Sequence, residues 1–142
     1  MQAHSLNIRV GNTQWTGWAL LALGMWLIVA PFALGYAAID AAVINDGAFG
    51  VLIAGLAAYS MVAPRRVAEV FALFATAAGL WVASAPFLLG YTVWHGPDLG
   101  QSAAPFVADY PVPAIVNDLV VGFSVVILGL MRAVTFGAWR RA

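Results

Sequence analysis

The sequence predicts an all-α transmembrane protein, a four-helix bundle of two tandem two-helix repeats with pseudo-twofold symmetry along the membrane normal. The 142-residue chain is 63% hydrophobic and only 8% charged, against roughly 25% charged residues in a soluble domain. Its long uncharged stretches are sufficient to cross a bilayer, which takes about 20 helical residues. A thirteen-residue pattern also occurs twice, as GMWLIVAPFALGY at 24–36 and as GLWVASAPFLLGY at 79–91.

The membrane spans are expected at 15–36, 44–63, 67–90 and 114–136. They should be helices, because backbone polar groups in lipid must be paired within the segment and the runs lack the alternating polarity of β-barrel strands. The first span follows a polar tail, 1–14, and is too long for the core of a cleavable signal peptide. The fourth reaches full length only if Asp118 lies in its outer first turn and Arg132 extends to the opposite interface.

Charges are segregated between the two ends of the predicted bundle. With four spans, both termini and the 64–66 loop share one side, and all six arginines lie there or at its edge, whereas five of the six acidic residues lie on the other side. The positive-inside rule then places both termini, including the basic tail 137–142, in the cytoplasm. The long loop 92–113 is external, and we expect it to lie on the membrane surface and to cap the bundle or contact a partner.

The duplication extends over both helices of each unit, 15–63 and 67–136. The candidate positions match in pairs: Trp26 with Trp81, Pro31 with Pro86, Tyr36 with Tyr91, Asn45 with Asn117, and Asp46 with Asp118. The first three pairs are 55 residues apart and the last two are 72 apart, because the second external loop is longer. A two-span unit returns to its starting side, so both units have the same orientation.

This pattern resembles the SPW repeat family of small prokaryotic membrane proteins, marked by a Ser-Pro-Trp-type motif late in the first helix of a two-helix unit. The resemblance covers about 15–135 in two copies and is carried by the frame G-x-W-x4-P-F-x2-G-Y. The motif itself is replaced by Ala-Pro-Phe at 30–32 and 85–87. The resemblance implies the architecture and a bacterial cytoplasmic membrane location, but no particular activity.

The repeated prolines and tryptophans each have a structural and a functional interpretation. Pro31 and Pro86 free the carbonyls four residues before them, so they either kink and end their helices near the following glycines or open a small polar cavity. Trp26 and Trp81 lie near the middle of their spans, where they either pack between helices or wall a site for a lipid, quinone or pigment. Each indole N–H needs a partner.

The other repeated residues lie near the external ends of the spans. Tyr36 and Tyr91 fit the external aromatic belt of a membrane protein. The two Asn-Asp pairs, 45–46 and 117–118, open the second helix of each unit, so they either cap it or converge about the pseudo-axis to bind a cation. We also expect a polar contact, direct or through water, between each Asn-Asp pair and the proline kink of its unit.

Small residues recur at four-residue spacing and predict close packing faces, either within the bundle or between subunits. These positions are Gly50, Ala54 and Ala58, and Ala75, Gly79 and Ala83.

The sequence offers no catalytic, metal-binding or cofactor-binding residue that stands out. It has no cysteine, no cluster with metal-ligand spacing and no glycine-rich phosphate loop. The predicted function is therefore a non-enzymatic scaffold or accessory subunit. Two alternatives stay open: a binder or carrier of a small hydrophobic molecule or ion at the proline-kinked repeat interface, and a lipid-modifying enzyme that uses Asp46 and Asp118. Expected partners are membrane lipids and a second copy or larger membrane complex, whereas nucleic acid would need a clustered basic face.

Overall fold

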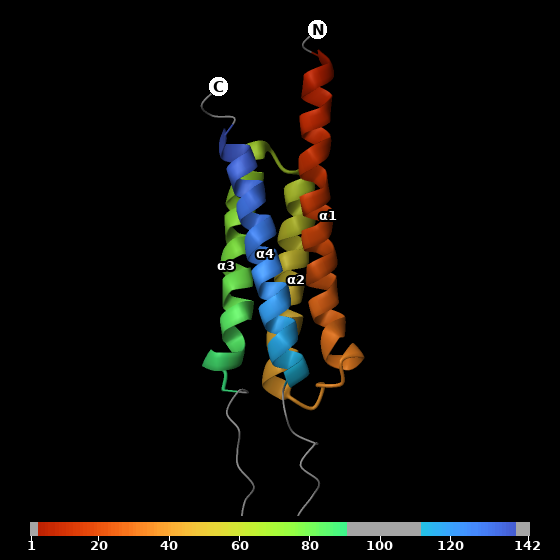
Figure 1. Ribbon diagram of the computed structural model, residues 1–142, viewed down its shortest axis with the longest axis vertical. Coiled ribbons are helices and arrows are strands. Elements are labelled where there is room, and N and C mark those ends of the chain that lie inside the picture. Colours follow the sequence, from red (N-terminus) through yellow and green to blue (C-terminus); the bar gives the residue numbers. More distant parts are fainter. Residues whose placement is uncertain (1–2, 91–111, 139–142) are drawn as a thin grey trace, which may run out of the picture.

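The computed structural model describes residues 3–90 and 112–138, with side chains over 14–90 and 112–135. These ranges form four helices, α1 (Ala3–Ala33), α2 (Asp40–Val62), α3 (Arg65–Leu88) and α4 (Val112–Ala138). Each contains a stretch that is long and apolar enough to cross a membrane. The start of α1, the α2–α3 connection and the end of α4 lie at one end of the elongated bundle (Figure 1). The predicted four-helix membrane fold is confirmed.

The first helix begins much earlier than the predicted span. It starts at Ala3 instead of near residue 15, although its membrane-crossing stretch begins at Gln14. Nothing in the polar segment breaks the helix, since its first proline is Pro31. A helix satisfies its own backbone and can therefore continue past the hydrocarbon into a polar environment.

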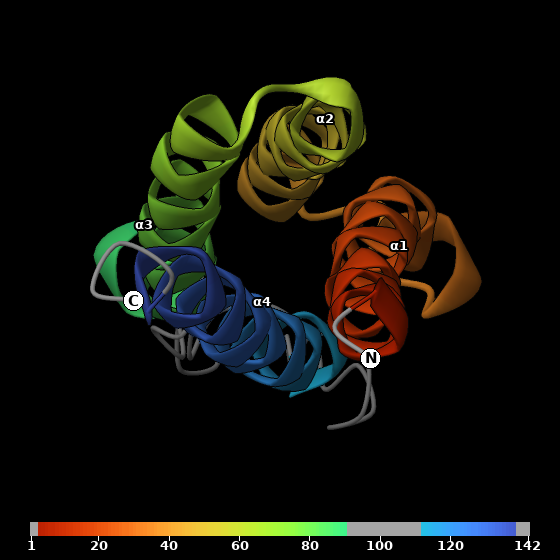
Figure 2. The ribbon, with the colours of Figure 1, turned by 90° about the horizontal axis from the view of Figure 1, so that it is seen from above.

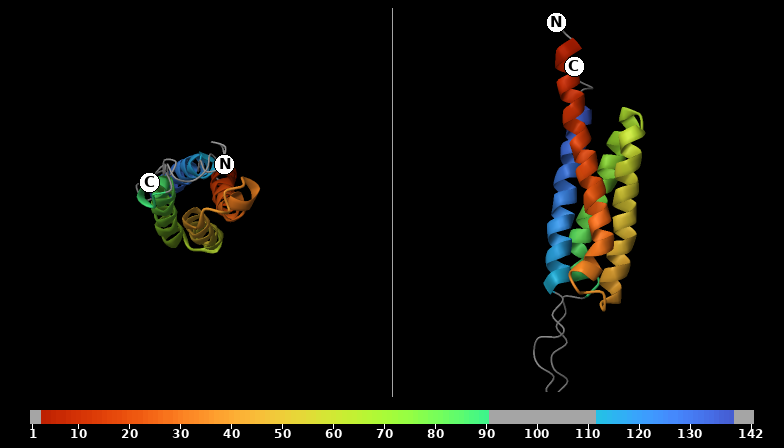
Figure 3. Two further views of the ribbon diagram at one scale, coloured as in Figure 1. Left: turned by 90° about the horizontal axis from the view of Figure 1, so that it is seen from below. Right: turned by 90° about the vertical axis from the view of Figure 1, so that its right-hand side faces the viewer.

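The helices form a ring in chain order, so α1 lies between α2 and α4, and α3 lies between the same two helices on the other side (Figures 2 and 3). The most extensive packing is within the repeats, between α1 and α2 and between α3 and α4. A Cβ added to Gly50 would lie 2.7 Å from the backbone oxygen of Gly24, and one added to Gly122 would lie 2.7 Å from that of Gly79. Each repeat is thus held by equivalent backbone-to-backbone contacts that only glycine permits.

The predicted small-residue faces pack within the bundle at every position but one. Gly50 and Ala54 are buried in α2, but Ala58 is exposed and Ala57 is buried in its place. Steps of four residues drift by about 40° each around a helix of 3.6 residues per turn, so the third position leaves the buried face. In α3, all three predicted positions are buried, because this helix packs against both α2 and α4.

Large apolar side chains occupy both the centre and the outside of the bundle. Leu27, Ile53, Val82 and Val125 are fully buried at the centre, while residues such as Phe32, 71% exposed, cover the surface. An apolar exterior of this extent is suited to hydrocarbon and not to water. The distribution agrees with the membrane-spanning assignment.

The helices α1 and α3 end as the proline pattern predicts. Pro31 and Pro86 are each third from the last residue of their helix, and the last turn of each helix bends away from the bundle (Figure 1). Gly35 and Gly90 follow with φ of 78° and 76°, a left-handed conformation that disfavours residues with a Cβ. Both repeats therefore use the same proline-then-glycine helix ending.

The expected placement of Asp118 in the first turn of α4 is wrong, because Asp118 is the seventh residue of the helix and is fully buried. Arg132 is only 3% exposed. Its guanidinium donates from Nη1 to Thr16 Oγ1 at 3.3 Å and from Nη2 to the Ser60 carbonyl at 3.1 Å. Oxygen acceptors on α1 and α2 thus hold this side chain inside the bundle, close to the end of the α4 span.

Candidate functional site

A group of hydrogen-bonded polar and aromatic side chains lies toward the end of the bundle where α1 joins α2. We call this group the polar cluster; it consists of Trp26, Tyr36, Asn45, Asp46, Trp81, Asn117 and Asp118. Its members come from all four helices and from the α1–α2 connection. The sequence identified every one of these positions, but not how they are paired.

The Asn-Asp pairs do not cap their helices. The N-cap of α2 is Ile39, which makes no side-chain capping bond, and Asn45 and Asp46 are the sixth and seventh residues of the helix. The pair 117–118 occupies the same positions in α4. Both helices begin earlier than predicted, so the pairs lie in the second turn, where their side chains face the bundle interior and are buried.

The two repeats exchange hydrogen bonds through their tryptophans. Trp26 Nε1 donates to Asn117 Oδ1 at 2.9 Å, and Trp81 Nε1 donates to Asn45 Oδ1 at 3.0 Å. Each indole therefore reaches the asparagine of the other repeat. Each ring is still about 40% exposed at its outer side, which suits a side chain that contacts lipid while its N–H is satisfied inside. The two bonds are related by the pseudo-twofold symmetry: the first repeat supplies the tryptophan of one bond and the asparagine of the other.

Tyr36 lies inside the cluster, and its prediction as an aromatic-belt residue is wrong. The left-handed Gly35 turns the chain back toward the bundle, and Tyr36 is only 4% exposed. Its hydroxyl donates to Asp46 Oδ2 at 2.6 Å and accepts from Asn117 Nδ2 at 3.0 Å. Burial, with a further contribution from the bonded Asp46, raises the pKa of Tyr36 above its ordinary value, so the phenol stays a donor. Its counterpart Tyr91 lies outside the described residues.

The two aspartates are both fully buried. Asn45 Nδ2 donates to Asp46 Oδ1 at 3.2 Å and Asn117 Nδ2 to Asp118 Oδ1 at 3.4 Å. Hydrogen-bond donors of this kind reduce the cost of burying a carboxyl group in a membrane.

The side-chain amides of Asn45 and Asn117 donate to other members of the polar cluster and not to the proline kinks. The amide of Asn45 donates to Asp46, and that of Asn117 donates to Tyr36 and Asp118, whereas we expected a contact, direct or through one water, between each Asn-Asp pair and the proline kink of its repeat. In the first repeat, Tyr36 makes the link instead. It follows the α1 proline by five residues and bonds to α2, so it ties the bent helix end to its neighbour.

The chemistry of the cluster is that of a hydrogen-bonded connection between the repeats. Over the described side chains, no group of three His, Cys, Asp or Glu residues is placed to hold a metal ion. The polar groups of the cluster are bonded mainly to one another, across helices.

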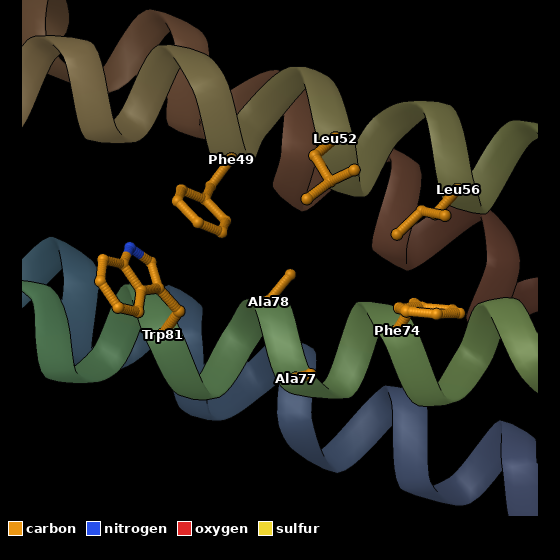
Figure 4. Close-up of a pocket in the computed structure, with 7 residues that line it drawn as sticks. All are labelled: Phe49, Leu52, Leu56, Phe74, Ala77, Ala78 and Trp81. Atoms are coloured by element: carbon orange, nitrogen blue, oxygen red, sulfur yellow. The ribbon is translucent and has the colours of Figure 1, made fainter.

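A second feature is an apolar groove between α2 and α3, with a volume of about 280 Å³. It is lined by Phe49, Leu52, Leu56, Phe74, Ala77, Ala78 and Trp81 (Figure 4). The rings of Phe49 and Trp81 stack with centroids 5.8 Å apart, so Trp81 belongs to both the polar cluster and the groove. The sequence predicted Trp81 as a candidate wall but carried no signal for the other residues, because the groove depends on which helices are neighbours.

Comparison with known proteins finds one family. The family model of the SPW repeat domain matches residues 14–98, more than half of the chain. The match includes α2, most of α1 and the whole of α3. No curated protein and no solved structure matches the chain. The helix α4 lies beyond the match, and its Asn-Asp pair is assigned to the repeat by internal comparison.

Proposed function

We propose that this chain, which belongs to the SPW repeat family, is a non-enzymatic scaffold or accessory subunit in the bacterial cytoplasmic membrane. The observation that carries this proposal is the reciprocal pair of bonds from Trp26 to Asn117 and from Trp81 to Asn45. These bonds commit the polar groups to joining the two repeats. They make a firm four-helix unit whose outer faces are free to contact other membrane proteins.

The burial of the aspartates supports a structural role over a catalytic one. An acid or base must reach a proton of the substrate within about 3 Å, directly or through one water. Asp46 and Asp118 are fully buried, and their described contacts are with members of the polar cluster. Their contribution is then to hold the repeats together and not to act on a lipid.

A scaffold must contact its partner through a defined face, and this can be tested by photo-crosslinking in the native membrane. One exposed residue on each helix would be replaced in turn by benzoylphenylalanine: Phe32, Val51, Leu80 and Phe123. We expect discrete protein adducts at one or two of the four faces and none at the others. An adduct of twice the chain mass would identify a second copy as the partner. An absence of protein adducts at all four positions would overturn the proposal.

The orientation is part of the same proposal. Arg65 and Arg66 begin α3 and are exposed at the end of the bundle where α1 starts and α4 ends (Figure 1). The positive-inside rule assigns that end to the cytoplasm. An alkaline phosphatase fusion near residue 100 should be active and one after Ala142 inactive. The reverse pattern would invert the orientation.

The groove favours a second candidate function, the binding of a small hydrophobic molecule at the boundary between the repeats. Its lining residues come from α2 of the first repeat and α3 of the second. The volume of about 280 Å³ is close to the lower end of ordinary ligand pockets, roughly 300 Å³.

A further inference from the structure

We infer that the groove between α2 and α3 binds one hydrocarbon chain of a membrane lipid. This inference rests on the second candidate function and names its ligand class. The lining is formed by aliphatic and aromatic side chains only, so it can recognise length and shape but not a headgroup.

The position of the groove determines the medium that fills it. The α2 residues of the lining lie between 49 and 56, inside a span that runs from Asp40 to Val62. A seven-residue separation along a helix corresponds to about 10 Å. At this depth the surrounding medium is hydrocarbon, and water would find no polar partner in the groove. An empty groove would forfeit the dispersion contacts of its walls.

The shape of the groove suits a linear chain lying along the helices. Phe49 and Trp81 lie together at one end, and Leu56 and Phe74 lie at the other (Figure 4). Between them, the α3 side of the groove is formed by alanines, which leave the space open. The groove has a volume of about 280 Å³, and its lining extends over about 10 Å along α2. The helix of a second chain, about 10 Å across, could insert single side chains but could not fill the groove lengthwise.

Comparison of the two repeats shows that this boundary is specialised. At the offsets that align the repeats, the positions of Phe49 and Phe74 correspond to Val121 and Ala19. The polar positions of the cluster are identical in both repeats. Phe49 and Phe74, in contrast, lie at the boundary between α2 and α3, and the corresponding residues of α4 and α1 are smaller. The two repeats are therefore alike in the polar cluster and different in the residues that line the α2–α3 groove. That pattern fits a binding surface on one side of the bundle.

Trp81 connects the groove to the polar cluster. Its ring forms part of the wall and stacks on Phe49, while its N–H donates to Asn45. A hydrocarbon chain packed against the Trp81 ring would limit the motion of the ring and so stabilise the hydrogen bond between Trp81 and Asn45. The bound lipid would therefore act as a structural part of the bundle.

The test is lipid retention by the full-length chain, measured by native mass spectrometry. The protein is reconstituted in vesicles of palmitoyl-oleoyl phosphatidylcholine or of the corresponding phosphatidylglycerol, extracted in mild detergent and washed in steps. The variant Ala77→Leu fills the groove from α3. Its matched control is Ala22→Leu, the equivalent and also exposed position of the first repeat. Leu52→Trp fills the groove from α2 and serves if Ala77→Leu does not fold, as judged by circular dichroism and thermal melting.

We expect wild type and Ala22→Leu to retain one more lipid than either groove-filling variant, with both headgroups alike. Equal retention by all folded variants, or retention of one headgroup only, would overturn the inference. A dimer that Ala77→Leu abolishes would mean that a second copy occupies the groove and would also overturn it. A retained apolar molecule other than a phospholipid, lost in Ala77→Leu, would overturn the lipid assignment but leave the second candidate function standing. No retained molecule of any kind would overturn both.

Discussion

The reciprocal tryptophan–asparagine bonds predict which residues of the polar cluster are energetically coupled. In the structure Trp26 bonds to Asn117 and Trp81 to Asn45. The decisive perturbations are Trp26→Phe, which removes the donor but keeps an aromatic ring, and Asn117→Leu, which removes the acceptor at similar volume. The same two changes at the second pair provide an independent repetition within one molecule.

The expected magnitudes follow from the bonds that each change removes. Asn117→Leu loses the bonds to Trp26 at 2.9 Å and to Tyr36 at 3.0 Å, and a longer one to Asp118 at 3.4 Å. Interhelical hydrogen bonds in membrane proteins contribute about 0.6 kcal/mol on average and up to about 1.7 kcal/mol. Two good bonds therefore give a loss of roughly 1–3 kcal/mol in the free energy of unfolding for Asn117→Leu. The coupling energy between Trp26→Phe and Asn117→Leu should be about 0.6–1.7 kcal/mol.

The assay is reversible unfolding in bicelles, followed for wild type, the single variants and the double variants. A double-mutant cycle cancels the volume lost at the tryptophan, because that loss occurs on both sides of the cycle. The control cycles pair residues within a repeat, Trp26 with Asn45 and Trp81 with Asn117. These pairs make no direct bond with each other among the described contacts, so their coupling should be weaker than that of the bonded pairs.

Stronger coupling within the repeats than between them would refute the reasoning. It would show that each two-helix unit satisfies its own tryptophan, and that the polar cluster does not join the repeats. Equal coupling in all four cycles would also count against it, because the bonds would then be part of a diffuse network.

Three further predictions concern single positions. Gly122→Ala should destabilise the bundle by about 1–3 kcal/mol, because the added Cβ would overlap with backbone atoms. Gly55→Ala should be neutral or slightly stabilising, because nothing lies within 4 Å of its added Cβ. Unfolding of both variants in bicelles measures the difference. Arg132→Met should lower the unfolding free energy by more than 1 kcal/mol through loss of the bonds to Thr16 and to the Ser60 carbonyl. Arg66→Met, at an exposed position, should change the unfolding free energy by less than about 0.5 kcal/mol. Similar losses in the two variants would contradict the burial of Arg132. The raised pKa of Tyr36 means that the folded state keeps a proton that the unfolded state loses above about pH 10. The contribution of Tyr36 to stability should therefore be complete below that pH and decline as the pH rises further. Since Tyr36 does not ionise in the folded protein, the tyrosinate absorbance of wild type should follow that of Tyr36→Phe up to the pH at which the protein unfolds.

The sequence by itself determined the features that depend on local properties. Four apolar stretches had to become helices, because lipid offers the backbone no hydrogen-bonding partner. A proline followed by a glycine at positions 31 and 35, and again at 86 and 90, ended two helices in the same way because both residues restrict the backbone locally. The duplicated pattern also identified every position of the polar cluster, since buried polar residues are scarce in so apolar a chain.

Only the tertiary structure decided how those positions meet. Two identical sets of Trp, Asn and Asp can pair within each repeat or between repeats, and the sequence is the same in either case. The order of the helices around the ring allows either pairing, because each helix has one neighbour in its own repeat and one in the other, and the side-chain geometry gives the exchanged pairing. The same arrangement brings Thr16 and the Ser60 carbonyl to Arg132, and places the groove between α2 and α3. The hydrogen bonds among these features join residues 36 to 116 positions apart, and the groove likewise joins two helices, so local propensity does not encode them.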